Sequence, residues 1–263
     1  MSREILSVRE MTMDFGGLRA VNNVTVTMEE REIIALIGPN GAGKTTFFNC
    51  VTGVYTPTAG DIFIMPAVGV EESIKGLRPS TITHKGLART FQNIRLFGAM
   101  TVLENVMIGR HGRLKSGIFG AILRDRRTRE EEERVIHDSY AILKRLGLES
   151  FVNELARNLP YGAQRRLEIA RALATEPFLL LLDEPAAGMN PQETKELEHL
   201  IKQIRDTEQV SIFLIEHDMS LVMSLSERIY VMDYGKLIAS GEPYEVKNNP
   251  EVIKAYLGEE VDA

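Results

Sequence analysis

A glycine-rich stretch near residue 40 constrains the fold of this chain more than any other feature. It consists of Gly38, Pro39, Asn40, Gly41, Ala42, Gly43, Lys44, Thr45 and Thr46. This stretch matches the phosphate-binding loop pattern G-x-x-x-x-G-K-[ST]. Residues 32–37 predict a buried strand before the loop, and residues 45–52 predict a short helix that ends at Gly53. Because such loops connect a strand to a helix, the surroundings support the pattern and disfavour a chance glycine-rich turn.

The residue types of the loop suit the phosphates of ATP together with Mg²⁺. Gly38, Gly41 and Gly43 can adopt positive φ angles, which lets backbone N–H groups approach an anion closely. The N-terminus of the following helix adds N–H donors and a partial positive charge. Lys44 supplies a full charge to the β- and γ-phosphates, and the Thr45 hydroxyl can bind Mg²⁺.

Length, charge and cysteine content limit the possible classes of protein. A chain of 263 residues can form one domain with a large insertion. Its net charge of −6 disfavours nonspecific nucleic-acid binding, so no nucleic-acid partner is expected. The single cysteine, Cys50, excludes an internal disulfide, suits a reducing compartment and is expected to be a small buried residue. We expect no signal peptide, and the longest apolar run, residues 178–182, is too short to span a bilayer. Any membrane association is therefore expected to go through a partner.

The first two thirds of the chain predict strands around the loop and then helices. Residues 5–15, 24–28 and 61–65 predict an antiparallel sheet built partly before and partly after the loop, and residues 66–80 predict a loop. Residues 99–109 predict a helix. Residues 110–129 are strongly basic, which indicates either a contact surface for a partner or a solvated face.

A longer helix is expected after the basic stretch. Thr128 to Glu131 resemble a capping box. Apolar residues recur behind it at helical spacing, and Gly147 is expected to end the helix.

The last third predicts the remainder of a parallel sheet. Residues 178–184 are an apolar run that ends in Asp183 and Glu184, as a central parallel strand would. Asn190 and Pro191 are expected to open a helix as its N-cap and first residue, with Leu197, Leu200, Ile201 and Ile204 on the buried face. Residues 210–215 predict the next strand, 228–232 and 236–239 a hairpin, and 243–257 short helices.

These elements predict an α/β fold, that of a P-loop NTPase with a RecA-like parallel sheet core. An antiparallel β subdomain and an α-helical insertion are added to this core. Residues 1–92 would form the first part of the nucleotide-binding core, 93–170 the helical subdomain, and 171–263 the second part with the C-terminal helices.

Four side chains outside the loop are candidates for the chemistry. Asp183 can hold the Mg²⁺ shell, and Glu184 can orient and deprotonate a water that attacks the γ-phosphate. Gln92 can contact Mg²⁺ or this water, although a surface amide is the alternative. His217 follows a strand that is expected beside the one ending in Asp183, so it is expected near the γ-phosphate, with a structural role as the alternative.

The order of these motifs resembles that of an ATP-binding cassette ATPase. The loop at 38–45, Gln92, a signature-like stretch at 159–167, the strand to Asp183 and Glu184, and His217 follow the family order over nearly the whole chain. The resemblance implies that two cassettes pair head to tail. Each ATP would then lie between the phosphate loop of one chain and the signature residues Tyr161, Gly162 and Ala163 of the other. It also implies that Phe15 stacks on adenine, with a core phenylalanine as the alternative.

Finer features are similar to the ATP-binding subunit of branched-chain amino acid importers. They lie at 15–23, 89–97, 184–191 and 248–259, and the basic stretch at 110–129 is of the same type. The resemblance implies an ATPase that binds transmembrane permease subunits through its helical insertion and serves a solute-binding protein indirectly. It implies a second cassette subunit, in a homodimer or heterodimer, on the cytoplasmic face of the cell membrane.

The sequence departs from the family pattern in two places, the signature and the segment after the two acids. The family signature is Leu-Ser-Gly-Gly-Gln, whereas Pro160, Tyr161 and Ala163 stand here for Ser, the first Gly and Gln. Because Pro160 offers no donor, Gly162 and the N–H groups at Ala163 and Gln164 are expected to carry the contact with the partner's nucleotide. Asn190 stands where Asp is usual.

Other functions remain open at this level. The urea or amide importers and the lipopolysaccharide exporters have similar ATPase subunits. A soluble cassette of translation or DNA repair would carry tandem cassettes or a long coiled coil. A small-molecule P-loop kinase would leave His217 and residues 159–167 without a role.

Overall fold

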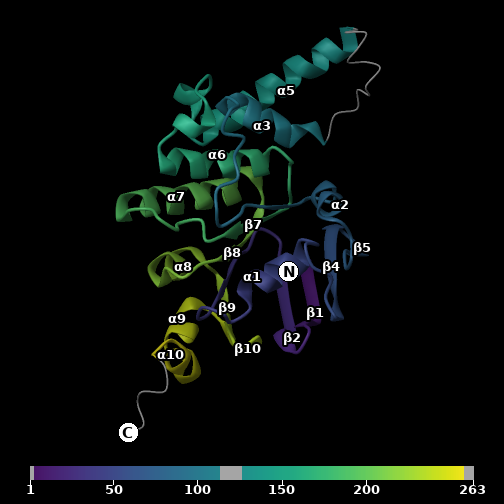
Figure 1. The fold of residues 1–263 in the computed structure, drawn as a ribbon, viewed down its shortest axis with the longest axis vertical. Helices are drawn as coiled ribbons and strands as arrows, with labels where there is room; N and C mark the ends of the chain where they lie inside the picture. Colours follow the sequence, from purple (N-terminus) through teal and green to yellow (C-terminus); the bar gives the residue numbers. More distant parts are fainter. Residues whose placement is uncertain (1–2, 113–125, 258–263) are drawn as a thin grey trace. The chain divides into compact units, whose positions relative to one another are not determined.

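The computed structural model describes residues 3–112 and 126–257 (Figure 1). The chain divides into two compact units. The first, which we call the core unit, comprises Met1–Arg89 and Phe178–Ala263. The second, the helical unit, comprises Thr90–Pro177. Each unit is described by itself.

A largely parallel sheet forms the centre of the core unit. Its strands are β3 (Ile33–Ile37), β6 (Leu87–Arg89), β7 (Leu179–Asp183), β8 (Ser211–Ile215), β9 (Arg228–Asp233) and β10 (Lys236–Gly241). They lie in the order β10-β9-β3-β8-β7-β6, and only β10 is antiparallel to its neighbour. Strands β3, β7 and β8 are buried throughout, which confirms that their apolar runs are those of covered parallel strands. The short β6 was not predicted, because three residues are too few to show a pattern.

A second, antiparallel sheet confirms that strands before and after the loop pair with each other. Its strands are β1 (Glu4–Phe15), β2 (Leu18–Glu29), β4 (Ala59–Ala67) and β5 (Val70–Ser73), in the order β2-β1-β4-β5. Strand β2 begins six residues before the predicted residue 24. It continues through Asn23, whose φ of 55° falls at an irregular register with β1, so a bulge replaces the expected break.

The helix after the phosphate loop, α1 (Lys44–Val51), contributes to the largest apolar cluster of the core unit. Phe47 and Phe48 on this helix pack edge-on against Phe213 of β8, with ring centroids 6.0 and 5.0 Å away. The cluster also contains residues of both sheets. Cys50 is buried in it, as expected. The loop is thus attached to a helix whose apolar face is buried in the core.

The other helices of the core unit are α2 (Pro79–His84), α7 (Pro191–Glu208), α8 (Met219–Leu225), α9 (Pro243–Lys247) and α10 (Pro250–Leu257). The Asn190 side chain accepts hydrogen bonds from the N–H groups of Gln192 and Glu193, which confirms the predicted cap of α7. The predicted loop over 66–80 is wrong in part, because strand β5 and the start of α2 lie within it. Val68 and Gly69 form a tight turn between β4 and β5, and Pro79 is the first residue of α2. Gly and Pro therefore stand here at the ends of strands and helices and do not indicate a long loop.

The helical unit contains α3 (Val102–His111), α5 (Arg126–Arg145) and α6 (Tyr161–Leu173), with short 3-10 turns at Glu149–Phe151 and Ala156–Asn158. Gly147 has a φ of 65° and follows α5, which confirms its predicted role. The predicted capping box at Thr128 is wrong, because α5 is already helical at Arg126. The true box of this unit is at Thr101, which caps α3 together with Glu104.

Part of the basic stretch lies outside the described residues, namely 113–125. Arg110, at its beginning, was expected on a contact surface or a solvated face. Instead it pairs within the helical unit with Asp138 at 2.8 Å and with Glu176 at 3.0 Å. Its charge therefore serves internal packing.

Candidate functional site

The predicted site residues of the core unit gather at the carboxyl edge of the parallel sheet. The phosphate loop follows β3, Glu184 follows β7, and His217 lies just beyond β8. Strand β8 lies between β3 and β7, so His217 is next to the strand that ends in Asp183, as predicted. Ligands of open α/β sheets bind at this edge.

The loop requires glycine at two positions for steric reasons. Gly38 has a φ of 149°, and a Cβ atom there would lie 2.0 Å from the Met232 carbonyl oxygen. Gly43 has a φ of 102°, and its Cβ atom would lie 2.4 Å from the Ala20 carbonyl oxygen. The loop is therefore pressed against β9 and β2, and any side chain at these positions would displace it.

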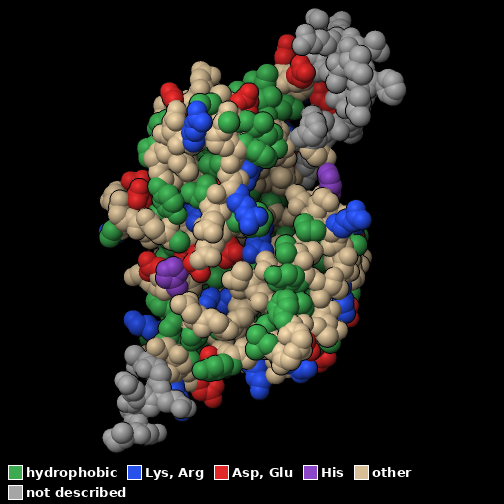
Figure 2. Space-filling model, viewed as in Figure 1, with side chains coloured by type: hydrophobic (Ala, Val, Ile, Leu, Met, Phe, Trp, Pro, Cys, Tyr) green, Lys and Arg blue, Asp and Glu red, His purple; other side chains and the backbone are tan. Residues whose placement is uncertain are grey.

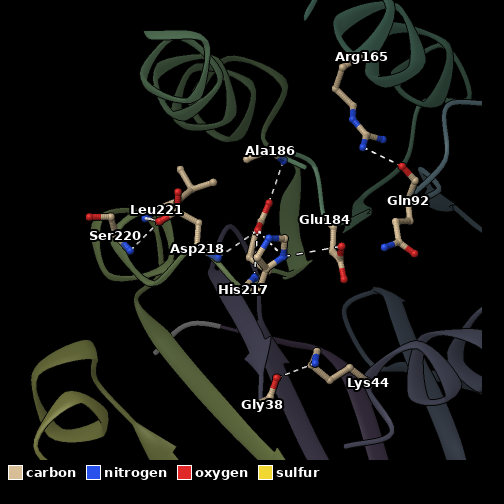
Figure 3. Close-up of polar contacts among 11 residues, drawn as sticks. Gly38, Lys44, Gln92, Arg165, Glu184, Ala186, His217, Asp218, Ser220 and Leu221 are labelled. Atoms are coloured by element: carbon tan, nitrogen blue, oxygen red, sulfur yellow. Dashed lines mark hydrogen bonds and ion pairs between the residues drawn. The ribbon is translucent and has the colours of Figure 1, made fainter. Parts of the chain in front are cut away.

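Lys44 is buried at the start of α1 and folds back over the loop (Figure 3). Its Nζ atom donates hydrogen bonds to the carbonyl oxygens of Gly38, at 2.7 Å, and Pro39, at 3.0 Å. Burial lowers the pKa of Lys44, and the charges of Glu184 and Asp183 oppose this shift. The next residue, Thr45, is exposed in the first turn of α1, and Thr46 is half-buried. The loop thus presents a positive charge and a hydroxyl near two carboxylates.

Asp183 forms a buried ion pair that the sequence did not predict. Arg89, at the end of β6, donates to Asp183 Oδ2 at 2.6 Å, and both side chains are almost fully buried. The same guanidinium donates to Asn49 Oδ1 at 2.7 Å and to Thr52 Oγ1 at 3.1 Å, both on or next to α1. Arg89 therefore joins the predicted metal-binding carboxylate to the helix that carries the loop.

Glu184 adopts a backbone conformation that is rare for its residue type. Its φ is +46°, in the left-handed region, while its N–H still donates to the Ile215 carbonyl at 2.9 Å. His217 Nδ1 lies 3.7 Å from Glu184 Oε2, so the two predicted catalytic side chains are neighbours (Figure 3). The His217 side chain is 61% exposed. The turn at Glu184 thus directs its carboxylate toward the site.

Glu216, between β8 and His217, is a second residue that sequence reasoning left without a role. Its side chain is fully buried and accepts hydrogen bonds from the N–H groups of Ala186 at 2.8 Å, His217 at 3.0 Å and Asp218 at 3.4 Å. Burial raises the pKa of Glu216, and these three hydrogen bonds oppose the rise. This carboxylate connects the segment after Glu184 with the segment that carries His217.

The oxygen atoms near the loop fit Mg²⁺ bound together with phosphates. Within residues 3–112 and 126–257, no group of three or more His, Cys, Asp or Glu side chains is placed to hold a metal ion. Mg²⁺ in nucleotide sites needs only one or two protein ligands besides phosphate and water. The Thr45 hydroxyl and the Asp183 carboxylate are of the right type for this role.

Phe15 lies at the end of β1 and is 41% exposed, so the alternative of a core phenylalanine is wrong. It packs edge-on against Tyr55, with ring centroids 5.2 Å apart. Tyr55 was not predicted as a site residue, because it lies in an irregular segment after α1. The pair offers an exposed aromatic surface on the core unit.

The C-terminal helix α10 lies beside the loop. Tyr256 receives a hydrogen bond from the Gly38 backbone, and burial raises the pKa of its hydroxyl. An open pocket of about 690 Å³ separates the rest of α10 from the loop, and its lining includes Asn40, Asp233, Tyr234 and Lys254. A residue more than two hundred positions away thus contacts the loop.

The remaining predicted site residues belong to the helical unit. Gln92 is exposed in an irregular segment, and Tyr161, Gly162 and Ala163 form the first turn of α6. Pro160 is the N-cap of this helix. The expectation for Gln164 needs a correction, because its N–H already donates to the Pro160 carbonyl at 3.0 Å. The N–H groups of residues 161–163 precede that first intrahelical bond.

Acidic and basic side chains are interspersed over the face shown in Figure 2. In the part of the chain that the structure describes, every helix is too short or too polar to cross a membrane.

Comparison with known proteins adds independent findings. Residues 21–187 match the model of the ABC transporter family, and residues 236–262 match that of the branched-chain amino acid ATP-binding cassette transporter. The chain is 51% identical to LivG of Salmonella typhimurium, a high-affinity branched-chain amino acid transport ATP-binding protein, over 98% of this chain and all of the relative. It is 48% identical, with the same coverage, to BraF of Pseudomonas aeruginosa, which has the same description.

Solved structures agree with these relatives. A nucleotide-free ATP-binding cassette from an ABC transporter matches with a TM-score of 0.83 and 30% identity, over 98% of this chain and all of that chain. A bacterial ABC transporter cassette solved as a dimer shares the fold, with a TM-score of 0.74 and 23% identity over 91% of this chain and 99% of that one. The predicted α/β fold with its antiparallel subdomain is confirmed.

Proposed function

The chain belongs to the ABC transporter family, and on this premise we propose that it is the ATP-hydrolysing subunit of an importer for branched-chain amino acids. The observation that carries the proposal is the cluster of Lys44, Asp183, Glu184 and His217 around a phosphate-binding loop. The importer class rests on the descriptions of the relatives and on the C-terminal match at 236–262.

In this function each side chain of the core unit has a separate task. Lys44 and backbone N–H groups of the phosphate loop bind the phosphates of ATP. Glu184 takes a proton from the attacking water, and His217, its neighbour, stabilises the γ-phosphate. When bound, Mg²⁺ would be held by Thr45 and Asp183 and would neutralise charge on the phosphate oxygens. Phe15 stacks on adenine, and Gln92 would contact the bound metal or the attacking water.

The partners follow from the same assignment. A second cassette, identical or homologous, supplies Tyr161, Gly162 and Ala163 to the nucleotide of the first. Transmembrane permease subunits hold both cassettes on the cytoplasmic face of the cell membrane, and a solute-binding protein delivers the amino acid. The dimeric solved cassette is an example of such pairing in the same fold.

Removal of the Lys44 charge tests the hydrolytic function. We expect Lys44→Ala to lower Mg²⁺-dependent phosphate release by at least about a hundredfold, since a buried cation that stabilises transition-state charge is lost. The matched control is Lys247→Ala, which removes an exposed lysine from α9. Full activity of Lys44→Ala in a steady-state assay contradicts the assignment.

The solute is tested separately, because its contacts lie in other subunits. Membrane subunits that copurify with the tagged chain are reconstituted with it in vesicles, and uptake of labelled leucine, isoleucine, valine and urea is compared. We expect ATP-dependent uptake of the three amino acids, and none with Lys44→Ala. Uptake of urea alone would replace the amino-acid assignment but leave the ATPase assignment unchanged.

A further inference from the structure

Two charged side chains lie in the interior of the helical unit without belonging to the site described above. Arg165 and Glu168, on successive turns of α6, are 0% and 1% exposed. Arg165 Nη1 donates to Glu168 Oε2 at 2.9 Å. A buried ion pair contributes little net stability compared with apolar residues of the same volume, because both charges must be removed from water. Its other contacts therefore indicate its purpose.

Both members of the pair hold the backbone of residues 91–95. Arg165 donates to the carbonyl oxygen of Gln92 at 2.9 Å (Figure 3). It also donates to the carbonyl oxygen of Phe91 at 2.7 Å. Glu168 Oε1 accepts from the N–H groups of Phe91, at 3.4 Å, and Arg95, at 3.3 Å. Carbonyl and amide groups of one short segment are thus bound by opposite charges of one helix.

This segment has no regular secondary structure to hold it. The Arg95 guanidinium stacks over the Phe91 ring at 4.4 Å, which closes the segment into a compact turn. The Gln92 side chain is exposed, although its carbonyl is bound by Arg165. The pair therefore fixes the backbone position from which the Gln92 side chain extends.

We propose that Arg165 and Glu168 are positioning residues that fasten residues 91–95 to α6, so that Gln92 and the first turn of α6 move as one body. The proposal rests on the proposed function, in which Gln92 meets the nucleotide of its own chain and residues 161–163 meet the nucleotide of the partner. The pair follows Ala163 within the next five residues of the same helix. A displacement of Gln92 at one nucleotide is transmitted to the turn that contacts the other.

The first test separates turnover from nucleotide binding. Glu168→Gln keeps the shape of the side chain but removes the charge that faces Arg165. Because the loop and Lys44 are untouched, we expect KM for ATP to stay within about twofold, whereas kcat falls about tenfold, a usual size for coupling between sites. Arg166→Lys is the matched control. Its guanidinium lies beside Gly147 at the end of α5, and we expect wild-type kcat.

The second test observes the segment directly. Glutamine has a single acceptor oxygen, which we expect to face the Arg165 guanidinium, and its NH2 group cannot accept from the Phe91 and Arg95 amides. Hydrogen–deuterium exchange of these two amides should therefore become at least about tenfold faster in Glu168→Gln. Exchange in α3 should be unchanged. This measurement needs no ATP, so it stands even if the chain does not hydrolyse ATP and the proposed function fails.

A double variant keeps the proposal testable if a lone buried charge prevents folding. Arg165→Met with Glu168→Leu removes both charges and keeps an apolar core of similar volume. We expect the double variant to melt at the wild-type temperature. Its Phe91 and Arg95 amides should nevertheless exchange fast, and its kcat should fall as in Glu168→Gln. A folded double variant with wild-type exchange and wild-type kcat overturns the proposal.

Discussion

At the scale of single residues, the buried thiol of Cys50 reports on the packing of the helix behind the phosphate loop. Burial raises its pKa to about 11. Only about one thiol in a thousand is then ionised at pH 8, and the thiolate is the reactive form. We expect the folded protein to react with iodoacetamide far more slowly than the denatured protein, as measured by mass spectrometry. Because Cys50 is the only cysteine, the same chain in denaturant is the control. Equal rates would mean that α1 is not packed as described.

Glu216 leads to a prediction about pH and stability. Because its pKa is raised in the folded protein, the protonated carboxyl contributes stability below the unfolded pKa. This contribution is lost as the pH rises through the folded pKa. Glu216→Gln stays neutral, so its free energy of unfolding should rise relative to wild type between about pH 5 and about pH 8.

Urea unfolding at both pH values measures this difference. Glu133→Gln, which changes an exposed carboxylate of α5, is the matched control and should show no such trend. If the difference between Glu216→Gln and wild type is the same at both pH values, the raised pKa is contradicted.

At the scale of elements, Pro160 determines what the first turn of α6 can offer. It is the N-cap, and its side chain makes no capping hydrogen bond. Serine at this position has two expected effects. Its hydroxyl can accept from the first turn, which stabilises the helix by about 1 kcal/mol. It also restores an N–H and an O–H donor for a nucleotide on the partner chain.

We therefore predict that Pro160→Ser, made together with Glu184→Gln, tightens ATP-driven dimerisation at least several-fold. The dimer dissociation constant is compared with that of Glu184→Gln alone, at fixed ATP and salt. Pro160→Ala separates the two effects, because it restores the N–H without the hydroxyl. An unchanged constant would show that the turn is complete without these donors.

At the scale of the whole molecule, hydrolysis is expected to require two chains. Glu184→Gln keeps the shape of the side chain but cannot take a proton from water. We expect this variant to bind ATP, to hydrolyse very little of it, and to accumulate as a dimer closed around two nucleotides. Sedimentation with and without ATP measures the change, and Lys44→Ala with Glu184→Gln is the control that should stay monomeric. A monomer at saturating ATP contradicts the prediction.

The sequence by itself determined the features that depend on local rules. The phosphate loop, the apolar runs of β3, β7 and β8, and the Asn190 cap each follow from a few neighbouring residues. The sequence also predicted part of the strand order, because acidic residues that follow apolar runs indicate the carboxyl edge of a parallel sheet. Local rules failed in residues 66–80, because Gly and Pro occur both in loops and at the ends of strands and helices. They also failed for β6, because three residues are too few to show a pattern.

Only the tertiary structure decided which side chains support the site. Arg89 and Asp183 are 94 residues apart, Arg165 and Phe91 are 74 apart, and Ala186 and Glu216 are 30 apart. Each of these contacts pairs a buried charge with a charge or backbone group that packing brings to it. Such a pairing produces no periodic pattern in the sequence. It forms because an unpaired charge in the interior would cost free energy, and this cost depends on which residues the fold brings together. The sequence therefore identified the candidate site residues at the carboxyl edge of the sheet, and the fold identified the residues that hold them in place.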